Sequence, residues 1–277
     1  MRADGKRIKN ADPMYTVGAY IMSKRVDSMN MVTVDIPLDP IKKYIAKRRE
    51  YKISHLALVI SAYLRTAAEY PALNRFVVNK KIYARNEFAV GMVVLKPDDD
   101  GHGTMSKMYF DYEDTIFDVQ RKIDEFIEKN RQSGQTNSTD DIIKKLLKVP
   151  GLCNVGVGLF KFLDKHGILP KKIIDASPFH MSLGITNLAS IRTNHIYHHT
   201  YEFGTTSVFI SMGNPRYVIK MKEEKPIFER CIPLGVVMDE RICSGSYFAI
   251  AFRRVSEYLK NPELLEEAPR VINRDET

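Results

Sequence analysis

The chain has 277 residues, of which 44% are hydrophobic and 27% are charged, a balance typical of soluble globular proteins. No apolar run reaches the roughly 18 residues needed to cross a bilayer, and the N-terminus lacks the apolar core of a secretory signal. Three cysteines without metal-ligand spacing indicate a reducing compartment and no disulfide framework. We therefore expect a cytoplasmic protein with one large α/β domain or two smaller ones, and no membrane partner.

The formal net charge of +8 fits three kinds of partner: nucleic acid, an anionic membrane surface or a phosphorylated ligand such as coenzyme A. The sequence shows no helix-turn-helix signature, no zinc-finger spacing and no aromatic-interleaved RNA motif. We interpret the charge as a solvated basic surface and do not expect nucleic-acid binding.

The first half of the chain predicts alternating strands and helices after an N-terminal arm, residues 1–27. The clearest helix covers residues 54–70, because Ser54 is a good N-cap and apolar residues then recur at helical spacing. Asn79-Lys80 predicts the turn of a hairpin. The other predicted elements are strands at 31–37, 88–95 and 104–110, helices at 38–50 and 115–131, and a strand or short helix at 15–22.

The second half predicts a polar loop, two helices and the remaining strands of one sheet. The loop covers residues 132–140, and no clear domain boundary follows it. The predicted helices are at 141–149 and 154–166, and the predicted strands are at 179–188, 203–212 and 226–238.

Two clusters contain residue types that bind metals. Asp98, Asp99 and Asp100 lie in a Gly-rich turn, where carboxylates are usually solvated. His195, His198 and His199 have no nearby carboxylate or cysteine to complete a site. We interpret the first as a turn and the second as a surface or interface cluster, so no metal is expected.

The stretch from Cys231 to Leu259 reads as a buried strand, a tight polar turn and an amphipathic helix capped by Ser244. Asp239, Arg241 and Gly245 in its turn match a His-x-x-x-Asp-Gly signature that is commonly preceded by Asp and followed by Arg. The stretch therefore resembles the catalytic cores of the dihydrolipoyl acyltransferases of 2-oxo-acid dehydrogenase complexes, whose fold chloramphenicol acetyltransferase shares. The signature's His position holds Glu240 and its Asp position holds Ser244.

Two further segments support this resemblance, which extends over residues 28–262. Pro71 to Asn74 is similar to a Pro-x-Leu-Asn segment of the family, and Thr186-Asn187-Leu188 to its Ser-Asn-Leu segment. The resemblance implies a two-layer α/β sandwich like that of chloramphenicol acetyltransferase, with a mixed sheet, helices on one side and a trimeric assembly. It implies an acyltransferase-like core at 28–262, a tail at 263–277 that is loose or lies on a neighbour, and no lipoyl domain.

The resemblance also implies roles for individual residues. Thr186 would supply the oxyanion hydroxyl, Glu240 would replace the base and Ser244 the supporting Asp, while Asn187 and Arg241 would contact coenzyme A or an acyl-coenzyme A donor. The pKa of Glu is about 4.3 against about 6.5 for His, so Glu is a poor proton acceptor from a thiol. Loss of a general base typically costs about 10² to 10⁴ in rate. An Arg241 contact would lower the pKa of Glu240 further. Cys243 is interpreted as a packing residue.

Two functions from different classes remain open. The first is a non-catalytic or much weakened homologue, a pseudoenzyme that forms a homotrimer and a cubic assembly or cage. The alternative is an active coenzyme-A-dependent acyltransferase that uses Glu240 as general base. The first is preferred, because both the base and its supporting acid are replaced.

Overall fold

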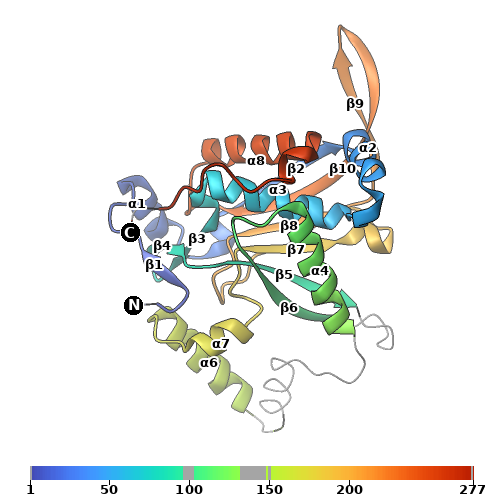
Figure 1. The fold of residues 1–277 in the computed structure, drawn as a ribbon. Helices are drawn as coiled ribbons and strands as arrows, with labels where there is room; N and C mark the ends of the chain where they lie inside the picture. The colour runs from blue at the N-terminus through green and yellow to red at the C-terminus, as the bar shows by residue number, and fades with distance from the viewer. Residues whose placement is uncertain (1, 96–102, 132–147, 149–150, 276) are drawn as a thin grey trace.

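The computed structural model describes residues 2–95, 103–131, 148, 151–275 and 277. Within them one large mixed sheet is covered on one face by long helices, while a three-stranded sheet lies beside one end of it (Figure 1). The predicted two-layer α/β architecture is therefore confirmed. The predicted loop at 132–140, the three aspartates at 98–100 and nearly all of the predicted helix at 141–149 lie outside the described residues.

The large sheet has the strand order β2-β10-β8-β7-β5-β6, and β9 pairs with the first half of β10. Only the β5–β7 and β7–β8 pairs are parallel. The sheet is formed by β2 (Met29–Pro37), β5 (Phe88–Leu95), β6 (Gly103–Phe110), β7 (Leu183–Asn187), β8 (Val208–Met212), β9 (Arg216–Lys222) and β10 (Lys225–Asp239).

The small sheet has the order β1-β4-β3, with β1 at Gly5–Arg7, β3 at Arg75–Val78 and β4 at Lys81–Arg85. Asn79 and Lys80 join β3 to β4, and both have positive φ, at 48° and 59°. A two-residue turn with positive φ at both positions matches the right-handed twist of its strands. The predicted hairpin is therefore confirmed.

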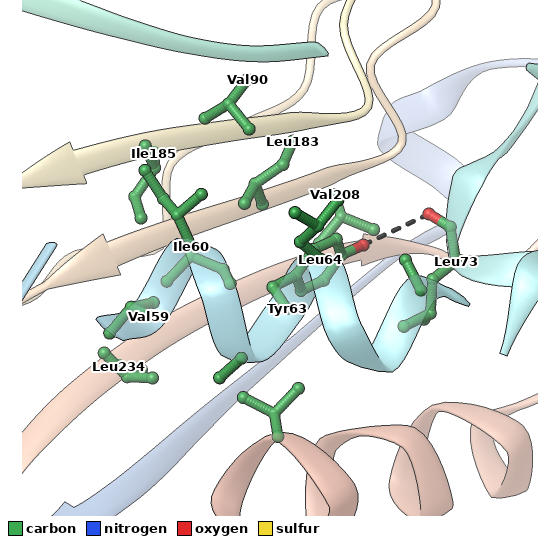
Figure 2. Packing of buried hydrophobic residues seen from close by; sticks show 14 of the residues in the cluster. Val59, Ile60, Tyr63, Leu64, Leu73, Val90, Leu183, Ile185, Val208 and Leu234 are labelled. Carbon is green, nitrogen blue, oxygen red and sulfur yellow. Dashed lines mark hydrogen bonds between the residues drawn. The ribbon is translucent and has the colours of Figure 1, made fainter. Parts of the chain in front are cut away.

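Helix α3 (His55–Glu69) is the centre of the core, because its apolar residues occur on all sides and 13 of its 15 residues are buried. Val59, Ile60 and Leu64 face apolar side chains of β5, β7, β8 and β10, and the Tyr63 hydroxyl donates to the Leu73 carbonyl at 3.2 Å (Figure 2). The other described helices are α1 (Pro13–Ile21), α2 (Leu38–Lys47), α4 (Ile116–Arg131), α6 (Leu152–Lys165), α7 (Lys171–Ala176) and α8 (Gly245–Lys260).

Part of the second face of the sheet is covered by the segment 193–200, which forms neither a helix nor a strand. Gly235 of β10 lies so close to the segment 193–200 that an added Cβ would meet Ser211 Oγ at 2.7 Å and the carbonyl of Ile196. Ser211 Oγ accepts from the Ile196 N–H at 3.1 Å. Glycine therefore lets this segment lie flat on the sheet.

Both ends of the chain pack on its own body. Arg2 is 6% exposed and pairs with Asp4 and Asp164 at 2.9 and 2.5 Å. In the tail, Asn273 bonds to the carbonyls of Ala68 and Glu69. The tail was expected to be loose or to lie on a neighbour, and in the structure Asn273 attaches it to α3 of its own chain. The boundaries at residues 27, 28, 262 and 263 stay predictions.

Strand β9 was not predicted, and β8 begins five residues later than the predicted strand at 203–212. Residues 203–207 instead bond as a loop: Thr205 N–H and Thr206 Oγ1 both donate to the Phe179 carbonyl. The predicted strand at 179–188 likewise shortens to β7, while the predicted strand at 226–238 matches β10.

We predict that Ile60→Ala lowers the free energy of unfolding by about 2–5 kcal/mol. The Ile60 side chain is fully buried, so its truncation leaves a cavity in the core. Ile250→Ala is the matched control, since Ile250 is 49% exposed on α8 and its truncation should change stability by less than about 0.5 kcal/mol. Urea unfolding followed by circular dichroism measures both. Equal losses of unfolding free energy in the two variants would contradict the position of α3 at the centre of the core.

We also predict an acid-sensitive N-terminal anchor. Burial alone would raise the pKa of Asp164, but His180 and Arg2 hold that pKa below its usual value. A lowered folded-state pKa stabilises the protein above the unfolded pKa, about 3.8, and the contribution disappears as pH falls through the folded value. Asp164→Asn should therefore lower the free energy of unfolding at pH 7. The difference in free energy of unfolding between the variant and the natural chain should become smaller below about pH 4. Urea unfolding midpoints of both proteins, measured between pH 7 and about pH 3, test this prediction. A difference in midpoint that does not change with pH would contradict it.

Candidate active site

The turn between β10 and α8 is built on the buried carboxylate of Asp239. This side chain has no exposure, and Arg241 donates to it from Nε at 2.8 Å and from Nη2 at 2.6 Å. The Arg241 backbone N–H and Ser28 Oγ also donate to it, at 3.1 and 2.9 Å. A buried charge needs such complete pairing, so the predicted polar turn forms a fixed structure.

Arg25 is the second cation at this carboxylate, with its Nε 3.7 Å from Asp239 Oδ2. The Arg25 guanidinium also donates to the carbonyl of Tyr201 and, at 2.9 Å, to that of Gly204. One arginine thus joins the N-terminal segment, the end of β10 and the 201–204 loop. The sequence did not predict this role. The chain has 42 Lys and Arg residues, and no sequence pattern indicates which of them pairs with Asp239.

Glu240 turns away from this cluster. Its Oε2 accepts from Asn30 Nδ2 at 2.6 Å, and its backbone N–H donates to the Ser28 carbonyl at 2.9 Å. Arg241 is the next residue in the chain, but its guanidinium donates to the Asp239 carboxylate and to the carbonyl of Met22. Glu240 is half-buried and can reach a solvent-borne group.

Ser244 caps α8: its Oγ accepts from the Tyr247 N–H at 3.1 Å and lies 2.8 Å from Ser246 Oγ. The structure therefore gives Ser244 a structural contact, and its role as a substitute for the signature's Asp stays a prediction. The neighbouring Cys243 is 2% exposed in the core, where burial raises the pKa of its thiol. Both features agree with a packing role for Cys243.

Thr186 and Asn187 lie at the far end of the sheet from Glu240. Thr186 pairs with Ser211, which pairs with Gly235, and Glu240 is five residues further along the chain. At about 3.3 Å per residue, Thr186 and Glu240 are about 17 Å apart along the strands, and the two strand spacings between β7 and β10 separate them further. One chain does not bring them together, so their combination in a site requires a second copy. Asn187 Oδ1 is buried and has no described partner.

A polar group that the sequence did not predict lies on the second face. His195 Nε2 is 3.0 Å from Thr33 Oγ1, which is 2.6 Å from the Tyr197 hydroxyl. Burial and Arg216 lower the pKa of His195, while Asp35 opposes them, and this favours the neutral ring. The ring and both hydroxyls hold the segment 193–200 on β2. The His-rich stretch signalled this group, but its partner on β2 is 162 residues away.

The described residues bring no three His, Cys, Asp or Glu side chains into a metal-binding arrangement. His198 instead stacks on Phe209, with ring centroids 4.1 Å apart, and on His199 at 5.1 Å. None of the described helices is both long enough and apolar enough to cross a membrane.

A mixed sheet with long helices on one face, and a turn leading from β10 into α8, define the class: the chain has the fold of the dihydrolipoamide acetyltransferase cores and of chloramphenicol acetyltransferase. The predicted resemblance is confirmed at the level of the fold. No protein-family model matches the sequence, and no curated protein matches it.

Three solved structures are similar to the chain. A probable dihydrolipoamide acetyltransferase from Listeria monocytogenes 4b F2365 superposes with a TM-score of 0.59 and 11% identity, over 92% of this chain and 95% of that one. The cubic core of the pyruvate dehydrogenase multienzyme complex gives 0.60 and 11%, over 90% and 89%. Chloramphenicol acetyltransferase gives 0.57 and 9%, over 92% and 99%. Identities this low show the fold alone.

The two neighbouring carboxylates should differ sharply in their effect on stability. Asp239→Asn removes the buried charge that compensates Arg25 and Arg241, and should lower the free energy of unfolding by about 3–5 kcal/mol. Glu240→Gln keeps the bond to Asn30 and should change stability by less than about 0.5 kcal/mol. Thermal and urea unfolding of both variants measure this. Equal losses of stability in the two variants would contradict the structural role assigned to Asp239.

Proposed function

We propose that the chain is a non-catalytic or much weakened acyltransferase-like protein that forms a homotrimer and, through it, a larger assembly or cage. The observation that carries this proposal is the carboxylate of Glu240 at the end of β10, where the resembling signature has an imidazole. Acyl transfer from a thioester needs a group that accepts the thiol or hydroxyl proton near neutral pH. A carboxylate bonded to the Asn30 amide is a weak acceptor.

The supporting residues agree with a weakened site. Ser244 Oγ is engaged in capping α8, and Arg241 is engaged with Asp239, so neither is held beside Glu240 by a described contact. Thr186 is at least about 17 Å from Glu240 in one chain. Restoring chemistry would therefore require more than one new side chain.

The assembly part of the proposal is supported by the β9–β10 hairpin, which extends away from the body (Figure 1). Tyr217, Ile219, Met221 and Phe228 lie on one face of it and are 62–70% exposed. No described strand pairs with the outer edge of β9 or with the free edge of residues 225–230. An isolated two-stranded ribbon is marginally stable, and open edges with an apolar face favour pairing with another chain.

The assembly is tested by the double variant Ile219→Asp with Phe228→Asp, which places two charges on the apolar face. Static light scattering should give the natural chain a mass of three or more times 31.8 kDa and the variant a single-chain mass. Ile227→Asp, on the opposite face of the hairpin beside Lys220, is the control and should leave the mass unchanged. A monomeric natural chain would overturn the proposal.

The alternative is an active coenzyme-A-dependent acyltransferase that uses Glu240 as base. The observation that favours it is that the Glu240 carboxylate is half-buried and is not paired with Arg241, so that it stays available to a substrate. Release of free thiol from acetyl-coenzyme A, with small thiol or amine acceptors, tests it. Turnover that Glu240→Ala abolishes would establish the alternative.

The same assay tests the weakened site directly. Glu240→His combined with Ser244→Asp supplies an imidazole and a carboxylate, and should raise thiol release by about 10² or more over the natural chain. Circular dichroism and unfolding midpoints must first show that the double variant is folded. A folded double variant with no gain would contradict the view that these two side chains limit the chemistry.

A further inference from the structure

A cavity of about 330 Å³ lies beside the Asp239 cluster, between segments that are far apart in the sequence. Its walls come from the end of α1, the β3–β4 turn, the last turns of α6 and the 202–204 loop. This volume is at the small end of the range for metabolite sites, about 300–1,000 Å³. Every wall belongs to one chain, so the cavity is complete without an assembly.

The inner wall of the cavity carries two buried cations, Arg25 and Arg241, which are 2% and 4% exposed. Arg241 is fully paired with Asp239, but Arg25 Nε is buried without a described hydrogen-bond partner. That Nε faces Asp239 Oδ2 at 3.7 Å, so the two arginines contribute positive charge to this wall.

The rim adds three exposed lysines, Lys80 from the β3–β4 turn and Lys161 and Lys165 from α6. None of the three forms an ion pair with a described residue; Lys80 instead lies over the Tyr20 ring at 4.7 Å. Three ammonium groups on two elements thus surround one opening.

The acidic residues of the same wall are already engaged. Asp164 pairs with Arg2 at 2.5 Å and lies 3.3 Å from His180 Nε2. Glu202 Oε1 accepts from the backbone N–H groups of Arg25 and Val26. The cavity therefore has a surplus of positive charge that its own carboxylates do not neutralise.

The remaining wall is apolar and aromatic, and is formed by Ala19, Val77, Val78 and Phe203. Phe203 is half-buried and packs its ring against Phe179 and His180, so its position is fixed. A ligand that fits both walls has an anionic end and an apolar or ring-containing part.

We propose that this cavity binds a phosphorylated small molecule, with its phosphates at Lys80, Lys161 and Lys165 and its apolar part against Phe203 and Val77. Lysine ammonium groups bind phosphate as point charges, and a diphosphate spans more than one of them. The inference goes beyond the proposed function, because it requires neither an assembly nor acyl transfer.

Isothermal titration with inorganic pyrophosphate at about 0.15 M salt tests the anionic end. The natural chain should bind, and Lys80→Gln/Lys161→Gln/Lys165→Gln should bind at least about tenfold more weakly. The matched control is Lys42→Gln/Lys43→Gln/Lys260→Gln, which removes the same charge from exposed positions outside the cavity and should change affinity by less than about twofold. Absence of binding by the natural chain, or equal losses in both triple variants, would overturn the proposal.

A second titration with ADP tests the apolar wall. Phe203→Ala should weaken ADP binding by about fivefold or more and leave pyrophosphate binding within about twofold, because only ADP has a ring to place there. Equal effects on both probes would contradict the predicted orientation. The Ile219→Asp/Phe228→Asp variant should keep the affinity of the natural chain for both probes. This result would show that ligand binding in the cavity does not depend on the assembly. Failure of one proposal could then be distinguished from failure of the other.

Discussion

The arrangement of the whole site depends on one buried carboxylate. Asp239 ends β10 with no exposure, and a charge in that position is tolerated only when cations and donors surround it. Arg241 comes from the same turn, whereas Arg25 and Ser28 come from the opposite end of the sequence. Satisfying this charge therefore fixes the N-terminal segment against the turn. It also directs Glu240 outward to Asn30 and makes the two arginines the inner wall of the neighbouring cavity.

Sequence patterns predicted those parts of the fold that depend on neighbours in the chain. The Ser54 cap and the helical spacing of apolar residues in 54–70 predicted α3, and Asn79-Lys80 predicted the turn of a hairpin, which the structure forms with positive φ at both residues. The contacts that form the site lie outside the reach of such patterns. Ser28 and Asp239 are 211 residues apart, and Thr33 and His195 are 162 apart. A pattern shows that Asp239 follows a buried strand, but the choice of its partners depends on the folded topology.

Strand β9 shows a different reason for a missed element. Its sequence does alternate, with Tyr217, Ile219 and Met221 on one face and Lys220 and Lys222 among the residues of the other. The period of two was present, but the apolar face meets no other part of the described chain and stays exposed. A strand is usually recognised from an alternation in which the apolar side faces a core. In β9 the apolar side faces no core within one chain, so the strand was not predicted. The same feature makes the hairpin informative about a second chain.

The turn that carries Glu240 and the basic cavity beside it are separate parts of the described chain. Chemistry between Glu240 and Thr186 would need two copies, since the sheet register holds these residues at least about 17 Å apart in one copy. The basic cavity is complete in one copy and shares with the turn only the arginines around Asp239. The charge network that forms the cavity wall centres on Asp239 and not on Glu240, so the side chain at position 240 does not determine that wall.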